Sequence, residues 1–127
     1  ERVKVMDFGL SRQVQDASSR VAVLTVAGTP AYMAPEQEQG SVRKESDVFA
    51  LGVCFYELLT GELPFDGVGA GMLANKLGGK HIPLSRRLGA VPPGLEETMA
   101  RAFSPDPDRR TRSPSEFSAA LGALKLL

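Results

Sequence analysis

The composition of this chain is that of an ordinary folded domain, and it excludes several classes of protein. The chain has 127 residues, 43% of them hydrophobic and 24% charged, with 15 basic and 15 acidic side chains. A chain of this length can bury roughly two thirds of its unfolded surface, which fits one domain or part of one. Zero net charge argues against an electrostatic binder of nucleic acid or membranes. The single cysteine, Cys54, excludes an internal disulfide framework and is compatible with a reducing cytoplasm.

Targeting signals are not found in the sequence as it stands. Its first residues do not form a basic segment followed by an apolar one, and no apolar run is long enough to span a bilayer. We therefore expect a cytoplasmic segment without membrane contact, although a parent protein could carry an anchor outside this segment.

The first 27 residues combine two short β-prone runs with a long irregular stretch. Residues 3–6 and residues 10–14 predict a pair of short strands. Residues 13–27 have neither the helical nor the alternating period, so they predict a loop. Structureless loops of that length are uncommon unless they are functional.

A helix that is apolar on nearly all sides is predicted over residues 46–60. Leu51 and Phe55 belong to a set of apolar residues at helical spacing, and further apolar residues extend around the circumference. Such a helix belongs in the middle of a domain. Gly61 is well placed to end it, and Pro64 prevents its continuation.

Two or three further helices are predicted, over about residues 68–77, 94–104 and 115–125. The last of them has Ser113 or Ser115 as its candidate N-cap. The links between these helices are rich in glycine and proline. The sequence therefore predicts a mainly α fold with a short strand pair at its N-terminal end.

Five motifs follow one another along the chain. Residues 7–9 read Asp-Phe-Gly, and residues 28–36 read Gly-Thr-Pro-Ala-Tyr-Met-Ala-Pro-Glu. The other three are Ser-Asp-Val-Phe-Ala-Leu-Gly-Val at 46–53, Thr-Gly-Glu-Leu-Pro-Phe at 60–65 and Asp-Pro-Asp-Arg-Arg at 106–110. Ordered sets of this kind rarely arise by chance. Together they resemble the large lobe of a protein kinase.

The wording of the motifs narrows this resemblance. Gly-Thr-Pro at residues 28–30 resembles the corresponding stretch of serine/threonine kinases, because tyrosine kinases usually have a different sequence there. Residues 46–53 and the Tyr-Glu-Leu-Leu-Thr-Gly that follows resemble the bacterial branch of the family. The chain is thus identified as a fragment of a bacterial-type (Hanks-type) serine/threonine protein kinase that starts just before Asp-Phe-Gly. The resemblance implies a partial catalytic domain over residues 1–127, with an activation segment at 7–36 and a helical lobe at 37–127.

The resemblance also implies an activity and its cofactors. The full parent would transfer the γ-phosphate of ATP to Ser/Thr hydroxyls of protein substrates, with Mg²⁺. Asp7 would be the magnesium ligand and thereby part of the ATP site, because carboxylates are hard oxygen ligands. Phe8 would be a packing residue linking the two lobes, and Gly9 the hinge. Taken alone, Asp7 is better explained as a turn residue before glycine, and only the downstream motifs favour the magnesium ligand.

Four residues farther along resemble known parts of the family. Thr29 is similar to the hydroxyl that contacts the catalytic aspartate and helps define a Ser/Thr substrate site. Glu36 and Arg110 resemble the buried ion pair of the family, which predicts that they lie within salt-bridge distance while Arg109 faces solvent. Asp47 resembles the carboxylate at the head of the central helix that receives backbone hydrogen bonds from the catalytic loop. The plain alternatives are a loop hydroxyl, solvated charges and an exposed acid at a helix N-terminus.

Two more sets of residues receive roles by the same resemblance. Cys54 and Leu58 fall where the family places apolar residues beneath the adenine pocket, and plain core packing explains both equally well. Thr25 occupies a position like that of the principal activating phosphothreonine. A phosphate there would order the loop against the basic side chain of Arg12. The alternative is an ordinary loop threonine and a solvated arginine.

Several groups needed for phosphoryl transfer are not found in this sequence. It has no glycine-rich loop after a strand, no Val-Ala-x-Lys and no His-Arg-Asp catalytic loop with its asparagine. We expect these groups to lie outside this chain, with a missing N-terminal lobe as its partner, and we expect the chain alone to be inactive. Two alternatives remain open, a non-catalytic helical interaction module derived from a kinase lobe and a gene fragment without independent function.

Overall fold

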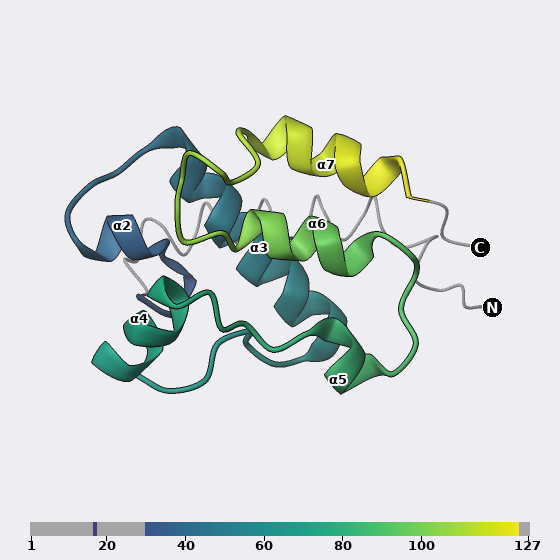
Figure 1. Ribbon diagram of the computed structural model, residues 1–127, viewed down its shortest axis with the longest axis horizontal. Coiled ribbons are helices and arrows are strands. Elements are labelled where there is room, and N and C mark those ends of the chain that lie inside the picture. The colour runs from purple at the N-terminus through teal and green to yellow at the C-terminus, as the bar shows by residue number, and fades with distance from the viewer. Residues whose placement is uncertain (1–16, 18–29, 125–127) are drawn as a thin grey trace.

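Figure 1 shows the computed structural model of the chain, which describes residue 17 and residues 30–124. Within these residues the secondary structure is entirely helical. The elements are η1 (Pro30–Tyr32), α2 (Pro35–Glu38), α3 (Lys44–Thr60), α4 (Ala70–Leu77), α5 (Leu84–Leu88), α6 (Leu95–Ala102) and α7 (Pro114–Gly122). None of these helices is long and apolar enough to cross a membrane. The predicted mainly α fold is confirmed, while the strands predicted at 3–6 and 10–14 lie outside the described residues.

Helix α3 is the centre of the structure, as its apolar circumference predicts. It packs against η1, α5, α6 and α7, and Figure 1 shows these elements arranged around it. Several of its side chains, among them Phe49, Cys54 and Tyr56, have no exposed surface. The helix begins two residues before the predicted start and ends where expected, since Gly61 takes the left-handed conformation with φ of 78°.

A cluster of aromatic rings joins α3 to α6. The Phe103 ring, just after α6, lies 5.6 Å from that of Phe49 and 5.5 Å from that of Phe65, centroid to centroid. Gly52 makes this approach possible, because a Cβ at that position would lie only 3.0 Å from Phe103 Cε1. The core is thus built around a point where α3 carries no side chain.

The three smaller predicted helices are present with shifted boundaries. They correspond to α4, α6 and α7. Ser113, and not Ser115, is the N-cap of α7, since its Oγ accepts a hydrogen bond from the backbone N–H of Glu116 at 3.1 Å.

The short helix α5 was not predicted, because its cap comes from a distant part of the chain. The Glu96 carboxylate accepts hydrogen bonds from the backbone N–H groups of Leu84 and Ser85, each at 2.9 Å. Five residues give too little periodicity to show a helix in the sequence.

Candidate functional site

The site centres on residues 30–38, which we call segment 30–38. It contains η1 and α2, and the sequence sets both of them locally. The backbone N–H of Met33 donates to the carbonyl of Pro30 at 3.0 Å, which closes η1. Pro35 occupies the first turn of α2, where the missing N–H and fixed φ of proline are tolerated. The segment packs against α3 through η1 and against α4 through α2.

One anchor of segment 30–38 is the ion pair between Glu36 and Arg110. Arg110 Nη1 lies 2.8 Å from Glu36 Oε2, and Nη2 lies 2.9 Å from Oε1. The Arg110 side chain is fully buried and that of Glu36 is 11% exposed, whereas the Arg109 side chain is 84% exposed. Glu36 and Arg110 thus lie within salt-bridge distance and are largely buried, while the side chain of Arg109 faces solvent, as the sequence predicted.

Arg110 uses the rest of its guanidinium to join other parts of the chain. It donates to the Glu45 carbonyl at 2.9 Å and twice to the Ser104 carbonyl, at 2.9 and 3.0 Å. Glu36 also accepts a hydrogen bond from Ser46 Oγ at 2.6 Å. Burial raises the pKa of Glu36, but the hydrogen bonds from Arg110 and Ser46 outweigh it, so the net pKa is lowered. The carboxylate therefore stays charged at neutral pH.

A second anchor, Lys76 of α4, was not found by sequence reasoning. Its side chain is fully buried, and its Nζ donates to the carbonyls of Pro30 at 2.9 Å and Met33 at 2.8 Å. It also donates to Glu38 Oε2 at 2.7 Å. Burial lowers the pKa of Lys76, and the nearby Glu38 carboxylate offsets part of this. The one sequence signal for its burial was the spacing from Met72, because residues four apart lie on the same face of a helix. Met72 and Lys76 are the two buried residues of α4.

Both anchors contact the same ring of the central helix. The Arg110 guanidinium lies over the Phe49 ring at 5.2 Å from its centroid, and Lys76 Nζ lies over the same ring at 5.7 Å. Both distances fall within the range of cation–π attraction. A third contact ties the segment to α3, because the Tyr32 hydroxyl donates to Glu57 Oε1 at 2.5 Å. Segment 30–38 is therefore fixed against α3 at several points.

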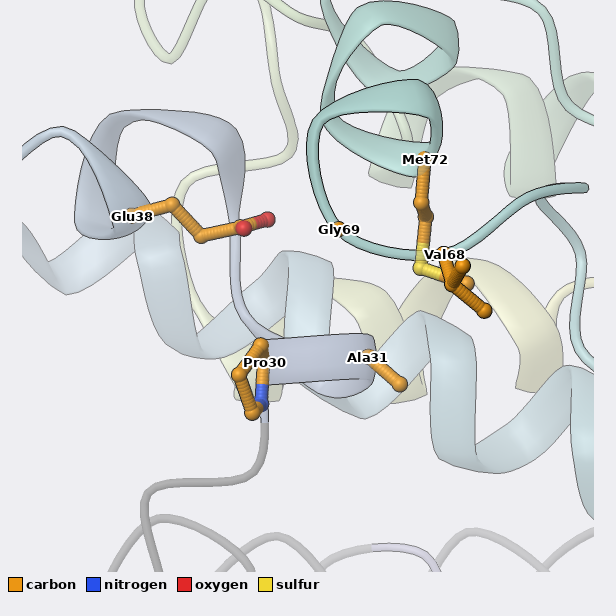
Figure 2. Close-up of a pocket in the computed structure, with 6 residues that line it drawn as sticks. All are labelled: Pro30, Ala31, Glu38, Val68, Gly69 and Met72. Carbon is orange, nitrogen blue, oxygen red and sulfur yellow. The ribbon is translucent and has the colours of Figure 1, made fainter.

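A pocket of about 180 Å³ lies between segment 30–38 and the start of α4. It is lined by Pro30, Ala31, Glu38, Val68, Gly69 and Met72. Figure 2 shows Pro30 and Ala31 on one side of this space and the residues around Gly69 on the other. The side of the pocket formed by Val68 is open to solvent, because that residue is 85% exposed. The lining is mostly apolar, with one carboxylate from Glu38.

Several of the other predicted site residues cannot be compared with the structure. Asp7, Phe8, Gly9, Thr25 and Thr29 lie outside the described residues. Among the residues that the structure does describe, no group of three His, Cys, Asp or Glu side chains could hold a metal ion.

The three predicted residues on α3 have different surroundings. Asp47 is exposed in the first turn of the helix. Cys54 is fully buried in the core, and Leu58 is partly buried against it. Core packing accounts for both of the latter positions. The roles at the catalytic loop and the adenine pocket stay predictions.

Comparisons with known proteins identify the family. The family described as protein kinase domain matches residues 1–112. The serine/threonine-protein kinase PknB of Mycolicibacterium smegmatis is 39% identical over 122 residues, which cover 94% of this chain and 20% of that protein. The serine/threonine-protein kinase pkn3 of Myxococcus xanthus is 38% identical over 130 residues, which cover 96% of this chain and 24% of that protein.

The chain spans about a fifth of the length of these curated relatives. The matched region includes all five motifs and both partners of the Glu36–Arg110 pair. The chain therefore belongs to the protein kinase family, as part of a bacterial-type serine/threonine kinase domain.

Proposed function

We propose that this chain forms the activation segment and helical lobe of a protein that transfers the γ-phosphate of ATP to Ser/Thr hydroxyls of protein substrates. The observation that carries the proposal is the fixed position of segment 30–38, which directly follows Thr29 in the chain. Two fully buried cations and a tyrosine hydroxyl hold this segment against α3 and α4. A rigid segment of this kind suits a group that must position a substrate, because positioning supplies much of phosphoryl-transfer catalysis.

The proposed roles of the individual residues follow from the motifs. Asp7 would hold Mg²⁺, which neutralises charge on the phosphates of ATP when it is bound. Thr29 would orient the catalytic aspartate toward the substrate hydroxyl. Residues 7–36 form the activation segment in this proposal, and residues 37–127 form the helical lobe that supports it.

The protein substrate is proposed to lie along segment 30–38 and over the pocket. Four of the six lining residues, Pro30, Ala31, Val68 and Met72, present apolar groups. A pocket of about 180 Å³ is large enough for one side chain of a peptide. An apolar side chain of the substrate close to its phosphorylated hydroxyl is the occupant that this lining favours.

The chain by itself is proposed to be inactive. Its sequence holds neither a His-Arg-Asp base nor a Val-Ala-x-Lys lysine. The base would come from a catalytic loop outside this chain, and the lysine and the glycine-rich loop from an N-terminal lobe that acts as the partner of this chain. Without them a bound substrate would meet neither a base nor a clamp on the phosphates of ATP.

Control of the activity is proposed to act through Thr25. A phosphate on Thr25 would add a charge of about −1.5 to −2 and three acceptor oxygens. It would order the loop by pairing with Arg12 and with the arginine of the His-Arg-Asp loop.

The proposal is tested by joining the chain to its upstream kinase sequence and measuring transfer of radiolabelled phosphate. We expect transfer by the joined protein, none by the 127-residue chain, and loss of transfer in Asp7→Ala. The matched control is Asp66→Ala, which removes an exposed aspartate from the loop before α4. Transfer by the isolated chain that depends on Asp7 would contradict its proposed inactivity. Binding of protein partners by a joined protein that transfers no phosphate would favour the interaction module instead.

The same protein tests the role of Thr25. Mass spectrometry after autophosphorylation should find phosphate on Thr25, and Thr25→Ala should lower the activity while Ser18→Ala leaves it unchanged. Full activity of Thr25→Ala, or phosphate confined to Ser18 and Ser19, would contradict this assignment.

A further inference from the structure

The Lys76 ammonium group is fully satisfied by three acceptors on segment 30–38. An ammonium has three N–H donors, and Nζ is within 2.9 Å of the Pro30 carbonyl, the Met33 carbonyl and Glu38 Oε2. The side chain has no exposed surface. Burying a charge is costly unless it is paired and hydrogen-bonded. This arrangement therefore fixes the three acceptors relative to one another as well as to α4.

The three acceptors belong to the elements that form the pocket. Pro30 and Glu38 both line it, and Met33 directly follows η1. Met72, another lining residue, lies four residues before Lys76 on the same face of α4. The Lys76 side chain thus sets the distance between the two sides of the pocket. It joins α4 to the first residue of η1, to the residue after η1 and to the last residue of α2.

We infer that Lys76 is a positioning residue for the binding of the protein substrate. It holds the Pro30–Met33 backbone, and through it the pocket, in the place where the substrate lies. The inference rests on the proposed function and extends it to a residue outside the five motifs. Its charge faces Glu38, and its Nζ also contacts, within the described part of the chain, two carbonyls and the Phe49 ring.

Methionine is the replacement that isolates this role. It has a similar length and is tolerated in an apolar interior, but it donates no hydrogen bond. In Lys76→Met the carbonyls of Pro30 and Met33 lose their common donor, so η1 is free to shift. The proposed role of Asp7 is in binding ATP, whereas the described partners of Lys76 all lie on segment 30–38. Binding of the protein substrate should therefore suffer while binding of ATP does not.

A double variant separates positioning from stability. Lys76→Met alone leaves the Glu38 carboxylate, which is 16% exposed, without its cation. Adding Glu38→Gln removes that charge, so Lys76→Met with Glu38→Gln should recover stability. It should not recover substrate binding, because neither the Pro30 nor the Met33 carbonyl regains the bond from Lys76 that ties it to α4. Arg87→Met is the control, since Arg87 bonds to Tyr56, Glu62 and Leu63 and to no residue of segment 30–38.

The experiment measures kinetics of the full kinase that contains this chain, with the best threonine peptide from a degenerate peptide library as the probe. We expect both Lys76 variants to raise the KM for the peptide by about tenfold, equivalent to about 1.4 kcal/mol of binding free energy, because the pocket is no longer held where the peptide lies. The KM for ATP and kcat should stay within about twofold of the wild-type values. Arg87→Met should leave the KM for the peptide unchanged.

The outcomes distinguish this inference from the proposed function. An unchanged KM for the peptide in both Lys76 variants would overturn the inference. A lower kcat together with an equal rise in the KM values for the peptide and for ATP would assign Lys76 to stability alone and overturn the inference. A double variant that does not fold would do the same. Failure of the wild-type kinase to phosphorylate any peptide of the library or itself would instead contradict the proposed function.

Discussion

The two buried cations that hold segment 30–38 do so by different chemistry. Arg110 binds both oxygens of Glu36 and also reaches the Glu45 and Ser104 carbonyls, because its planar guanidinium carries five donors in a fixed fork. Lys76 gathers three acceptors of one segment around a single nitrogen. The arginine therefore joins its own part of the chain, near Ser104, to Glu36 and Glu45, whereas the lysine shapes one short segment. We therefore expect the first to contribute mainly to stability and the second mainly to local geometry.

Removing Arg110 should have the largest effect on stability. Arg110→Ala leaves the Glu36 carboxylate buried without its cation, and breaking a buried pair in this way costs about 3 to 5 kcal/mol. The free energy of unfolding, measured by urea denaturation of the chain, should fall by that amount. Arg109→Ala is the matched control, and a surface change of this kind stays within about 0.5 kcal/mol. Equal effects of the two variants would show that the pair does not hold the fold.

Removing the charge of Glu36 should have an effect that depends on pH. Glu36→Gln leaves Arg110 buried without an anion, so we expect a loss of about 3 kcal/mol at pH 7. The folded-state pKa of Glu36 lies below its ordinary value of 4.5. Its contribution is therefore complete above pH 4.5 and is lost as the pH falls through the lowered value. The difference between wild type and Glu36→Gln should shrink below pH 4.5, and a constant difference would contradict the charged pair.

Removing the Lys76 ammonium should destabilise the chain less. Lys76→Met removes one donor from the Pro30 and Met33 carbonyls and from the Glu38 carboxylate, although the Pro30 carbonyl keeps its bond from the Met33 N–H. It also removes a costly buried charge. An unsatisfied buried polar group costs about 1 to 3 kcal/mol, and we expect a net loss in that range. Denaturation of Lys76→Met and of its double variant with Glu38→Gln measures this directly. A loss larger than that of Arg110→Ala would reverse the comparison between the two cations.

Removing an exposed arginine should have the smallest effect on the free energy of unfolding. Arg43 Nη2 lies 2.8 Å from Asp108 Oδ1, but the two side chains are 42% and 73% exposed. Exposed pairs are screened by salt and contribute little. Arg43→Ala should therefore have the smallest effect of the four, and 1 M NaCl should abolish it. An effect that persists in high salt would point to a role of Arg43 in packing.

The Glu36–Arg110 anchor was predicted because both residues belong to motifs. Lys76, the second anchor, was missed because it lies outside them. Glu36 and Arg110 were found because each ends a recognisable motif. Helix α3 was found because its apolar side chains cover the whole circumference. Lys76 stands in a helix with no motif, and a lysine in a sequence is normally exposed. Only the tertiary arrangement, which brings the carbonyls of Pro30 and Met33 to α4, shows why a lysine is buried there.

The same reason explains the missed helix α5 and the missed contact of Tyr32. The cap of α5 comes from Glu96, and the partner of the Tyr32 hydroxyl comes from Glu57. Both partners are more than ten residues away in sequence, so no local pattern signals them. Hydrogen bonds between a side chain and a group far along the chain are thus the part of this site that sequence periodicity could not show.

The long sequence separation of the Glu36–Arg110 pair has a consequence for how the protein is made. The partners are 74 residues apart, whereas Lys76 follows Pro30 by 46 residues. A ribosome adding about 5 to 20 residues per second takes roughly 4 to 15 s to go from Glu36 to Arg110. Segment 30–38 is thus synthesised early and acquires its strongest anchor late. During that interval Glu36 lacks the Arg110 partner that anchors it in the folded chain.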